Sequence, residues 1–237
     1  MPLAPWFNVI AGAQEERAFK AWRAVEAQHV VSTLRLTESD PGRQELLERI
    51  LEESKPPLPA GAEQHHYLLS TPFRYPPSRQ GSRFRAWPDG GVLYAARERR
   101  TACAEMGYWR WRFLRDSTGM TTMPAAAQTV FQLGAGGEGI DLTVEPLRAW
   151  RADWTDPVQY RATQELGRAA RALSMRWIAY ESVRDPEAGL CFAVLDPRAI
   201  RPRQPLARET WYLTVTESAA IWQRERQRFV FSFGSML

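Results

Sequence analysis

The chain reads WIAYESVRDPEAGLCFAVL from Trp177 to Leu195, and this stretch decides the fold class. Its two apolar runs, residues 177–181 and 190–195, are rich in the aromatic and aliphatic residues that favour strands, and no helical segment separates them. Strands that follow one another without a helical crossover pair antiparallel. The stretch therefore favours an α+β fold with mainly antiparallel sheets over a doubly wound parallel sheet.

The same character extends along the chain on both sides of this stretch. Further strand-like runs are expected at residues 67–70, 91–96, 129–133, 140–147, 211–216 and 228–233. Flanking helices are expected at residues 101–115 and 157–173, where apolar residues recur at helical spacing. The strands outnumber the helices and are not separated by regular crossovers, which again favours α+β.

The N-terminal part of the chain has a different pattern, typical of helices. Apolar residues recur at helical spacing in the stretch 14–36, and they are Ala18, Phe19, Trp22 and Val25. They predict a helix over at least the first part of that stretch. A second helix is predicted to begin after the capping residue Asp40 and to end before the prolines of residues 56–59. We therefore predict a helical N-terminal extension at residues 1–62 and a main domain at residues 63–237.

The composition is that of an ordinary globular protein. Of the 237 residues, 44% are hydrophobic and 24% are charged, which argues against a disordered or fibrous chain. No apolar run approaches the ~20 residues of a membrane-spanning helix, so a cytoplasmic protein that binds no membrane is expected. Cys103 and Cys191 are expected to be buried, and no metal site is expected from them and three histidines.

The charge of the chain leaves one alternative function open. A formal net charge of +4 and a pI near 9.3 permit nucleic-acid binding. The acidic and basic residues are, however, interleaved along most of the sequence. A nucleic-acid-binding module therefore stays an alternative and is not the favoured interpretation.

A glycine-rich segment at Gly134–Gly139 matches the G-x-G-x-x-G pattern of dinucleotide-binding folds. That pattern binds a diphosphate only where it joins a strand to a helix N-terminus. Here residues 140–147 continue as a strand, so the segment is interpreted as a loop between two strands. It is not expected to bind a nucleotide.

Several short segments, in a fixed order between Tyr67 and Pro197, resemble the RES-domain family of toxins. The first half contains Arg74-Tyr75, Gly81-Ser82-Arg83, Gly91-Val92-Leu93-Tyr94 and Glu105. The second half contains residues 176–184 and 189–197. Two departures from the family pattern occur, because Phe84-Arg85 stands where Trp-Asn is usual and the stretch from Glu105 to Ser182 is longer than usual.

The resemblance implies a fold similar to ADP-ribosyltransferases and consumption of NAD⁺ as substrate. Residues 63–237 would then form a RES-like, NAD⁺-binding catalytic domain. The family is named after an arginine, a glutamate and a serine, which correspond by local pattern to Arg74, Glu105 and Ser182. Arg83 is the rival candidate for the arginine.

Glu105 suits the cleavage of an N-glycosidic bond. In that reaction the ribose becomes oxocarbenium-like, and a nearby carboxylate stabilises the developing positive charge. Glu105 falls about one turn into its predicted helix, where the helix dipole would help to keep it ionised. It could also orient an acceptor or take its proton.

The other candidate residues suit the binding of NAD⁺. Arg74 and Arg83 could hold the diphosphate by charge-assisted hydrogen bonds, and Tyr75 and Tyr94 could stack on nicotinamide or bond a ribose. Ser182 would fix a ribose or diphosphate oxygen. It is not expected to be a nucleophile, because no Asp-His pair suggests a triad.

The expected function is that of a toxin in a toxin-antitoxin pair that transfers ADP-ribose to a cellular protein. An NAD⁺ glycohydrolase or phosphorylase that depletes NAD⁺ is the alternative within the enzyme class. The resemblance alone implies an antitoxin protein that covers the active site, through which nucleic acid would be contacted indirectly. An inert interaction protein on the same fold is the third possibility.

Overall fold

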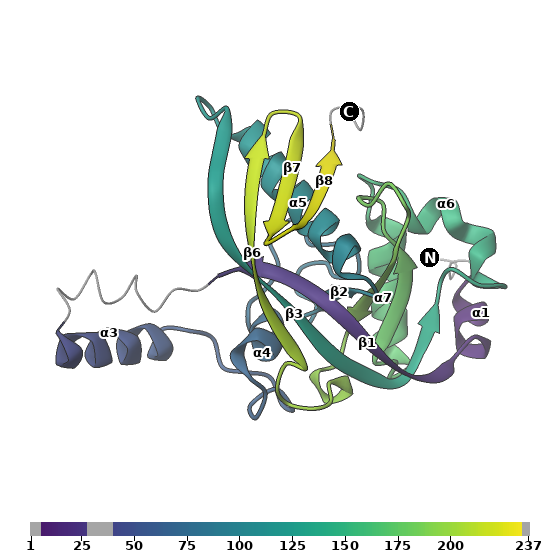
Figure 1. The fold of residues 1–237 in the computed structure, drawn as a ribbon. Helices are drawn as coiled ribbons and strands as arrows, with labels where there is room; N and C mark the ends of the chain where they lie inside the picture. Colours follow the sequence, from purple (N-terminus) through teal and green to yellow (C-terminus); the bar gives the residue numbers. More distant parts are fainter. Residues whose placement is uncertain (1–5, 28–39, 234–237) are drawn as a thin grey trace.

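The computed structural model describes residues 6–27 and 40–233. The helices are α1 (Phe7–Gly12), α3 (Pro41–Glu53), α4 (Tyr67–Arg74), α5 (Arg99–Asp116), η1 (Leu147–Trp150), α6 (Arg151–Trp154), α7 (Arg161–Ala172) and η2 (Pro197–Ala199). The strands are β1 (Glu15–Glu26), β2 (Leu93–Ala96), β3 (Thr122–Asp141), β4 (Trp177–Glu181), β5 (Leu190–Val194), β6 (Ala207–Thr216), β7 (Ala219–Arg224) and β8 (Gln227–Ser232). Helix α3 projects to the left of the sheet in Figure 1.

Within the described residues, eight strands form one sheet in the order β1-β2-β5-β4-β3-β6-β7-β8, and β1 also pairs with β3. The pairings among β1, β2, β5, β4 and β3 therefore close a ring, from which β6, β7 and β8 continue as an open sheet. The β3–β4 pair is parallel, and the other pairs of named strands are antiparallel. The predicted α+β class with a mainly antiparallel sheet is confirmed.

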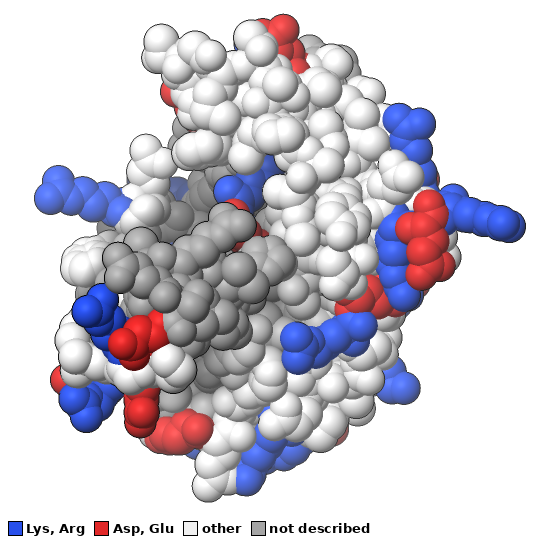
Figure 2. All heavy atoms as spheres, turned by 60° about the vertical axis from the view of Figure 1, so that its left-hand side comes forward, with Lys and Arg blue, Asp and Glu red and all other residues white. Residues whose placement is uncertain are grey.

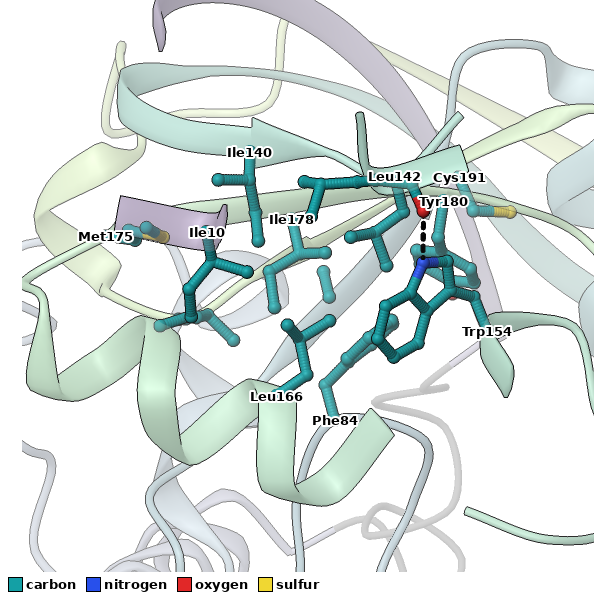
Figure 3. Packing of buried hydrophobic residues seen from close by; sticks show 14 of the residues in the cluster. Ile10, Phe84, Ile140, Leu142, Trp154, Leu166, Met175, Ile178, Tyr180 and Cys191 are labelled. Atoms are coloured by element: carbon teal, nitrogen blue, oxygen red, sulfur yellow. Dashed lines mark hydrogen bonds between the residues drawn. The ribbon is translucent and has the colours of Figure 1, made fainter. Parts of the chain in front are cut away.

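Three clusters of buried side chains hold helices against the sheet. The first joins α1 and α7 to the sheet through residues such as Ile10, Leu166 and Ile178 (Figure 3). In the same cluster the indole of Trp154 is fully enclosed, and its N–H donates to the carbonyl of Leu147 at 3.0 Å. Burial of an indole without a lost hydrogen bond stabilises this side of the sheet.

The second and third clusters position the two helices nearest the candidate site. Helix α4 is packed against the ring of strands through buried residues that include Leu69 and Phe73. Helix α5 is packed against β6, β7 and β8 through Trp111, Trp211 and Trp222. Since burying a large side chain stabilises by roughly 1.5–3 kcal/mol, these contacts fix α5 firmly on the sheet.

The helix predicted over the first part of residues 14–36 is wrong, because residues 15–26 form strand β1. All 12 residues of β1 pair with β3, and the ring of Phe19 stacks on that of Phe192 with centroids 3.9 Å apart. This long-range pairing outweighs the helical spacing of the apolar residues. Residues 28–36 lie outside the described part of the chain. The predicted boundary at residue 62 stays a prediction, although β1 belongs to the same sheet as the later strands.

The glycine-rich segment Gly134–Gly139 is the middle of strand β3, so its interpretation as a loop is wrong. A Cβ on Gly134 would lie 2.2 Å from the carbonyl oxygen of Arg201, and one on Gly139 would lie 2.3 Å from the ring of Trp177. The glycines therefore allow neighbouring segments of the same chain to approach β3 closely. Strand β3 ends at Asp141, so the strand predicted at residues 140–147 is wrong beyond residue 141, and no helix follows the glycine-rich segment directly.

Residues 67–70, predicted as a strand, lie in helix α4. The ring of His66 caps this helix by accepting a hydrogen bond from the backbone N–H of Leu68 at 3.2 Å, and a capped N-terminus favours helix over strand. Strand β7 was not predicted. The helix beginning after Asp40 and the elements α5, α7, β2, β4, β5, β6 and β8 confirm their predictions to within a few residues.

Candidate active site

A cavity of about 620 Å³ lies where β1, β2 and α5 meet. The segment 81–83 and residues at or beyond the facing ends of β4 and β5 complete its wall. Among the predicted site residues, Arg83, Tyr94 and Glu105 line this cavity. The volume lies in the range of cavities that bind small molecules and cofactors.

Glu105 and Ser182 are in direct contact. Glu105 lies in the second turn of α5, and Ser182 follows directly after β4. The Ser182 hydroxyl donates to Oε1 of Glu105 at 2.6 Å. The same Oγ accepts the backbone N–H groups of Arg184 at 3.2 Å and Asp185 at 3.0 Å, so its proton is directed at Glu105. Ser182 is buried and acts on the cavity through Glu105.

Burial raises the pKa of Glu105 above its ordinary value. The hydrogen bond from Ser182 and the charges of Arg83 and Arg184 oppose this rise, whereas the charge of Asp185 adds to it. The expectation that the helix dipole keeps this group ionised therefore misses the main effect, which is desolvation. A carboxylate with a raised pKa in a cavity is typical of a functional group.

Tyr94 and Arg83 hold the loop before β2 against the cavity. The Tyr94 hydroxyl bonds Oγ of Ser82 at 2.8 Å and accepts the backbone N–H of Phe84 at 3.0 Å. Burial raises the pKa of Tyr94, so its phenol stays neutral. Arg83 is buried, donates to the carbonyl of Trp154 at 2.7 Å and lies over the ring of Tyr160 at 4.8 Å.

Arg23 of β1 is a site residue that the sequence analysis missed. It lines the cavity, and its Nη1 donates to the carbonyl of Tyr94. Its Nε is buried without a hydrogen-bond partner among the described residues. Burial lowers the pKa of Arg23 to about 10. In a strand, Arg23 lies on the same face as Ala21 and Val25. An arginine in an otherwise apolar row is unusual, and this is the sequence signal that could have identified Arg23 as a site residue.

Arg184 is the second site residue without a sequence-based prediction. It is buried in the cavity wall, with its guanidinium 3.8 Å from the ring centroid of Tyr108. Its Nη2 donates to the carbonyl of Pro157 and to the hydroxyl of Tyr160. Four arginines line the cavity together with Glu26 and Glu105, and Arg110 is paired with Glu26. The other three guanidinium groups, from Arg23, Arg83 and Arg184, suit an anionic ligand.

Arg74 and Tyr75 lie apart from this cavity. The Arg74 guanidinium donates to the carbonyl of Pro56 and to Oε1 of Glu52 at 2.7 Å, and among the described residues Arg74 lines neither large cavity. Tyr75 is 41% exposed and lines a second cavity, of about 880 Å³. The structure thus groups Glu105, Ser182, Arg83 and Tyr94, and it places Arg74 at the base of helix α3.

The placement of Arg74 gives a direct test of its predicted role. For the NAD⁺ cleavage that the family resemblance implies, we expect Arg74→Gln to leave kcat/KM within about threefold, because its guanidinium bonds Glu52 and the carbonyl of Pro56 and, in the described part of the chain, lines neither large cavity. Nicotinamide release measured over a range of NAD⁺ concentrations checks this. A loss of tenfold or more would return Arg74 to the catalytic set.

Asp185 links the turn that carries Ser182 to the start of α5. Its carboxylate accepts the hydroxyl of Thr101 at 2.7 Å and pairs with the guanidinium of Arg100. Gly189 packs against this contact, since a Cβ there would lie 2.2 Å from the Thr101 hydroxyl oxygen. The network therefore fixes how the turn after β4 meets α5, and with it the distance between Ser182 and Glu105.

Asp185→Asn is expected to move the acidic limb of the kcat/KM profile to lower pH. Asn keeps an oxygen for Thr101 but removes the charge that helps to raise the pKa of Glu105, so the carboxylate forms at lower pH. Loss of the buried charge pair should also lower the free energy of unfolding by about 1–3 kcal/mol.

The matched control for this pH profile is Glu187→Gln. Glu187 pairs with the same Arg100 at 3.1 Å, but its side chain is 70% exposed, so the profile should keep its position. An unshifted limb in Asp185→Asn, or an equal shift in both variants, would contradict the electrostatic role.

Residues 6–27 and 40–233 contain no group of three or more His, Cys, Asp or Glu side chains placed to hold a metal ion. Nor do the helices in these two ranges include one long and apolar enough to cross a membrane. Cys103 and Cys191 are buried, as the sequence predicts, and both are free thiols. Sγ of Cys191 lies 4.0 Å from Oε1 of Glu105.

Comparison with known proteins identifies the family and the fold. The family model of the RES domain matches residues 58–216. Among solved structures, the chain is similar to one described as the Mycobacterium tuberculosis MbcT-MbcA toxin-antitoxin complex, with a TM-score of 0.51 and 15% sequence identity. That match covers 91% of this chain and 95% of the other. No curated protein matches the chain.

Proposed function

The chain belongs to the RES family, and from this premise we propose that it cleaves the nicotinamide-ribose bond of NAD⁺ and transfers the ADP-ribose to a cellular protein. One observation carries the proposal. The carboxylate of Glu105, held by Ser182 at 2.6 Å, faces a cavity that also contains Arg23 and Arg83. A carboxylate for a cationic sugar and guanidinium groups for a diphosphate are the two requirements of NAD⁺ as a substrate.

The proposed reaction breaks the bond between C1′ of the ribose and the pyridinium nitrogen. The electron pair of that bond leaves with nicotinamide, which becomes neutral, and the ribose becomes oxocarbenium-like. Glu105 would stabilise this positive charge, and the hydroxyl of Ser182 would fix the carboxylate in one orientation. A nucleophile then attacks C1′ and releases a proton, which Glu105 could accept.

The choice of nucleophile separates transfer from hydrolysis and phosphorolysis. Two apolar side chains on α5, Trp109 and Phe113, line the cavity and are each 54% exposed. Exposed aromatic groups at the rim of a cavity favour contact with a macromolecule. They support a protein acceptor, while cleavage by water or phosphate to deplete NAD⁺ is the alternative.

An antitoxin protein that covers the cavity is the partner we propose. The support is the RES domain together with a fold shared with a protein solved as a toxin-antitoxin complex. The half-exposed Trp109 and Phe113 would be buried by such a partner. The chain would then act in the cytoplasm as the toxin of the pair.

A nucleic-acid-binding function has weaker support. Figure 2 shows acidic and basic side chains intermixed around the edges of one face, and the described residues on its right-hand side include a broad uncharged area. Binding to the phosphate backbone of nucleic acid favours a continuous basic surface. A mobility shift with DNA or RNA that weakens as salt rises would revive this alternative.

The purified protein incubated with NAD⁺ tests the proposal directly, with free nicotinamide as the readout. Labelled NAD⁺ added with cell extract then identifies the acceptor. A labelled protein band supports transfer, and free ADP-ribose or its phosphate ester supports the depletion of NAD⁺. Nicotinamide at the level of buffer alone, with and without extract, would contradict the enzyme proposal.

A further inference from the structure

We propose that the second cavity binds the adenosine half of NAD⁺, so that the dinucleotide lies across two connected cavities with Arg23 between them. This inference rests on the proposed function. The second cavity, of about 880 Å³, lies between β1, α4, the segment 75–85 and β2. It shares part of its wall with the first cavity, namely Arg23, Val25, Glu26, Gly81, Ser82 and Tyr94.

Because the two cavities share this wall, a long ligand bound beside Glu105 would pass Arg23 and enter the second cavity. The hydroxyl groups of Tyr94 and Ser82, both in this shared wall, are hydrogen-bonded to each other at 2.8 Å. The Arg23 guanidinium is fixed at the same boundary by its hydrogen bond to the Tyr94 carbonyl. A diphosphate that joins two nucleoside halves would therefore meet Arg23 at its midpoint.

The far wall of the second cavity has the chemistry of a base-binding site. Tyr67 and Tyr75, at the start of α4 and just after its end, line the cavity and are 43% and 41% exposed. Pro72, Pro76 and Pro77 add further flat apolar surface. Exposed aromatic faces in a cavity favour stacking with a planar base such as adenine.

The charge of the second cavity favours an anionic ligand. Arg23 and Arg85 both line it, and the Nε atom of each is buried without a hydrogen-bond partner among the described residues. Glu26 in the same wall is paired with Arg110 at 2.6 Å. Phosphate oxygens would offset the cost of two buried guanidinium groups, which an uncharged ligand would not.

The test measures binding without turnover, using ADP and nicotinamide mononucleotide as separate probes in calorimetric titrations. Tyr75→Ala should raise the Kd for ADP by about tenfold, because it removes the stacking surface for adenine. The Kd for nicotinamide mononucleotide should stay within about twofold. Tyr75→Phe, which keeps the ring, should restore ADP binding.

Tyr212→Ala is the matched control, since Tyr212 is 53% exposed on β6 and is not among the described residues that line either cavity. It should leave both Kd values unchanged. An unchanged ADP Kd in Tyr75→Ala, or no ADP binding to the parent protein, would overturn the adenosine site. ADP binding that depends on Tyr75 in a protein that releases no nicotinamide would support the site and contradict the proposed reaction.

Discussion

Glu105→Gln is expected to lower kcat/KM for nicotinamide release by about 10² to 10⁴-fold. Gln keeps the size of the side chain and can still accept the hydrogen bond from Ser182, but it carries no charge to stabilise the oxocarbenium-like ribose. The loss should therefore appear mainly in kcat, because the charge develops in the transition state. Initial rates of nicotinamide release over a range of NAD⁺ concentrations measure both constants.

The matched control is Glu16→Gln, an exposed glutamate of β1 outside the described cavity walls. It should retain the parent activity within about twofold. A Glu105→Gln protein with more than a tenth of the parent kcat would remove Glu105 from the chemistry. In that case the cavity could bind NAD⁺, but its carboxylate would not act on the ribose.

The pH dependence of the unfolding free energy checks that the Glu105→Gln protein is folded. Burial raises the pKa of Glu105, so the folded state holds the proton more tightly than the unfolded state does. The stability that the carboxyl contributes is thus fully present below its unfolded pKa and is lost as pH rises through the folded pKa. We expect the variant to exceed the parent in unfolding free energy by more at pH 8 than at pH 4, measured by denaturant titration.

Arg23→Met should keep or raise the stability of the protein and lower its activity. Burial lowers the pKa of Arg23 to about 10, which corresponds to a cost of about 3 kcal/mol in keeping this group charged in the folded state. That cost is fully present below pH 10 and declines as the pH rises toward the pKa of the arginine in the unfolded state. Loss of the hydrogen bond to Tyr94 offsets about 1 kcal/mol, so the variant should unfold at an equal or higher denaturant concentration.

The activity of Arg23→Met should fall, because the proposed diphosphate loses a charge-assisted hydrogen bond. We expect kcat/KM to decrease by about 10- to 100-fold, mostly through a higher KM, since the contact is made equally in the bound substrate and the transition state. Arg23→Lys should recover only part of this loss, because an ammonium lacks the planar pair of donors. Full activity in Arg23→Met would contradict the proposed position of the diphosphate.

The site could be predicted in part because some of its residues are carried by local patterns. Glu105 lies in a helix that the sequence predicts, and Ser182 follows a strand whose bounds are predicted as the structure has them. Tyr94 lies in β2, which was also predicted. The order of these segments along the chain, compared with the RES family, was enough to select them. Their contact depends on Asp185 and Thr101, which no sequence pattern indicated.

Arg23 and Arg74 show why the rest could not be predicted. Arg74 lies beside a tyrosine, as the family pattern suggests, but Glu52 and the Pro56 carbonyl satisfy its guanidinium. Arg23 lies in a segment whose apolar spacing suits a helix. It lines the cavity only because β1 pairs with β3, a strand that comes much later in the chain. Gly136 of β3 lets the two backbones approach, since a Cβ there would lie 2.7 Å from the carbonyl oxygen of Arg17.

The sequence by itself determined the α+β class, the helix that carries Glu105 and the strand before Ser182. Each of these depends on residues that are neighbours in the chain. The tertiary structure alone decided that residues 15–26 form a strand and that Arg23 faces the cavity. The physical reason is that strand pairing and burial depend on distant partners, whose contribution exceeds the local preference of any short segment.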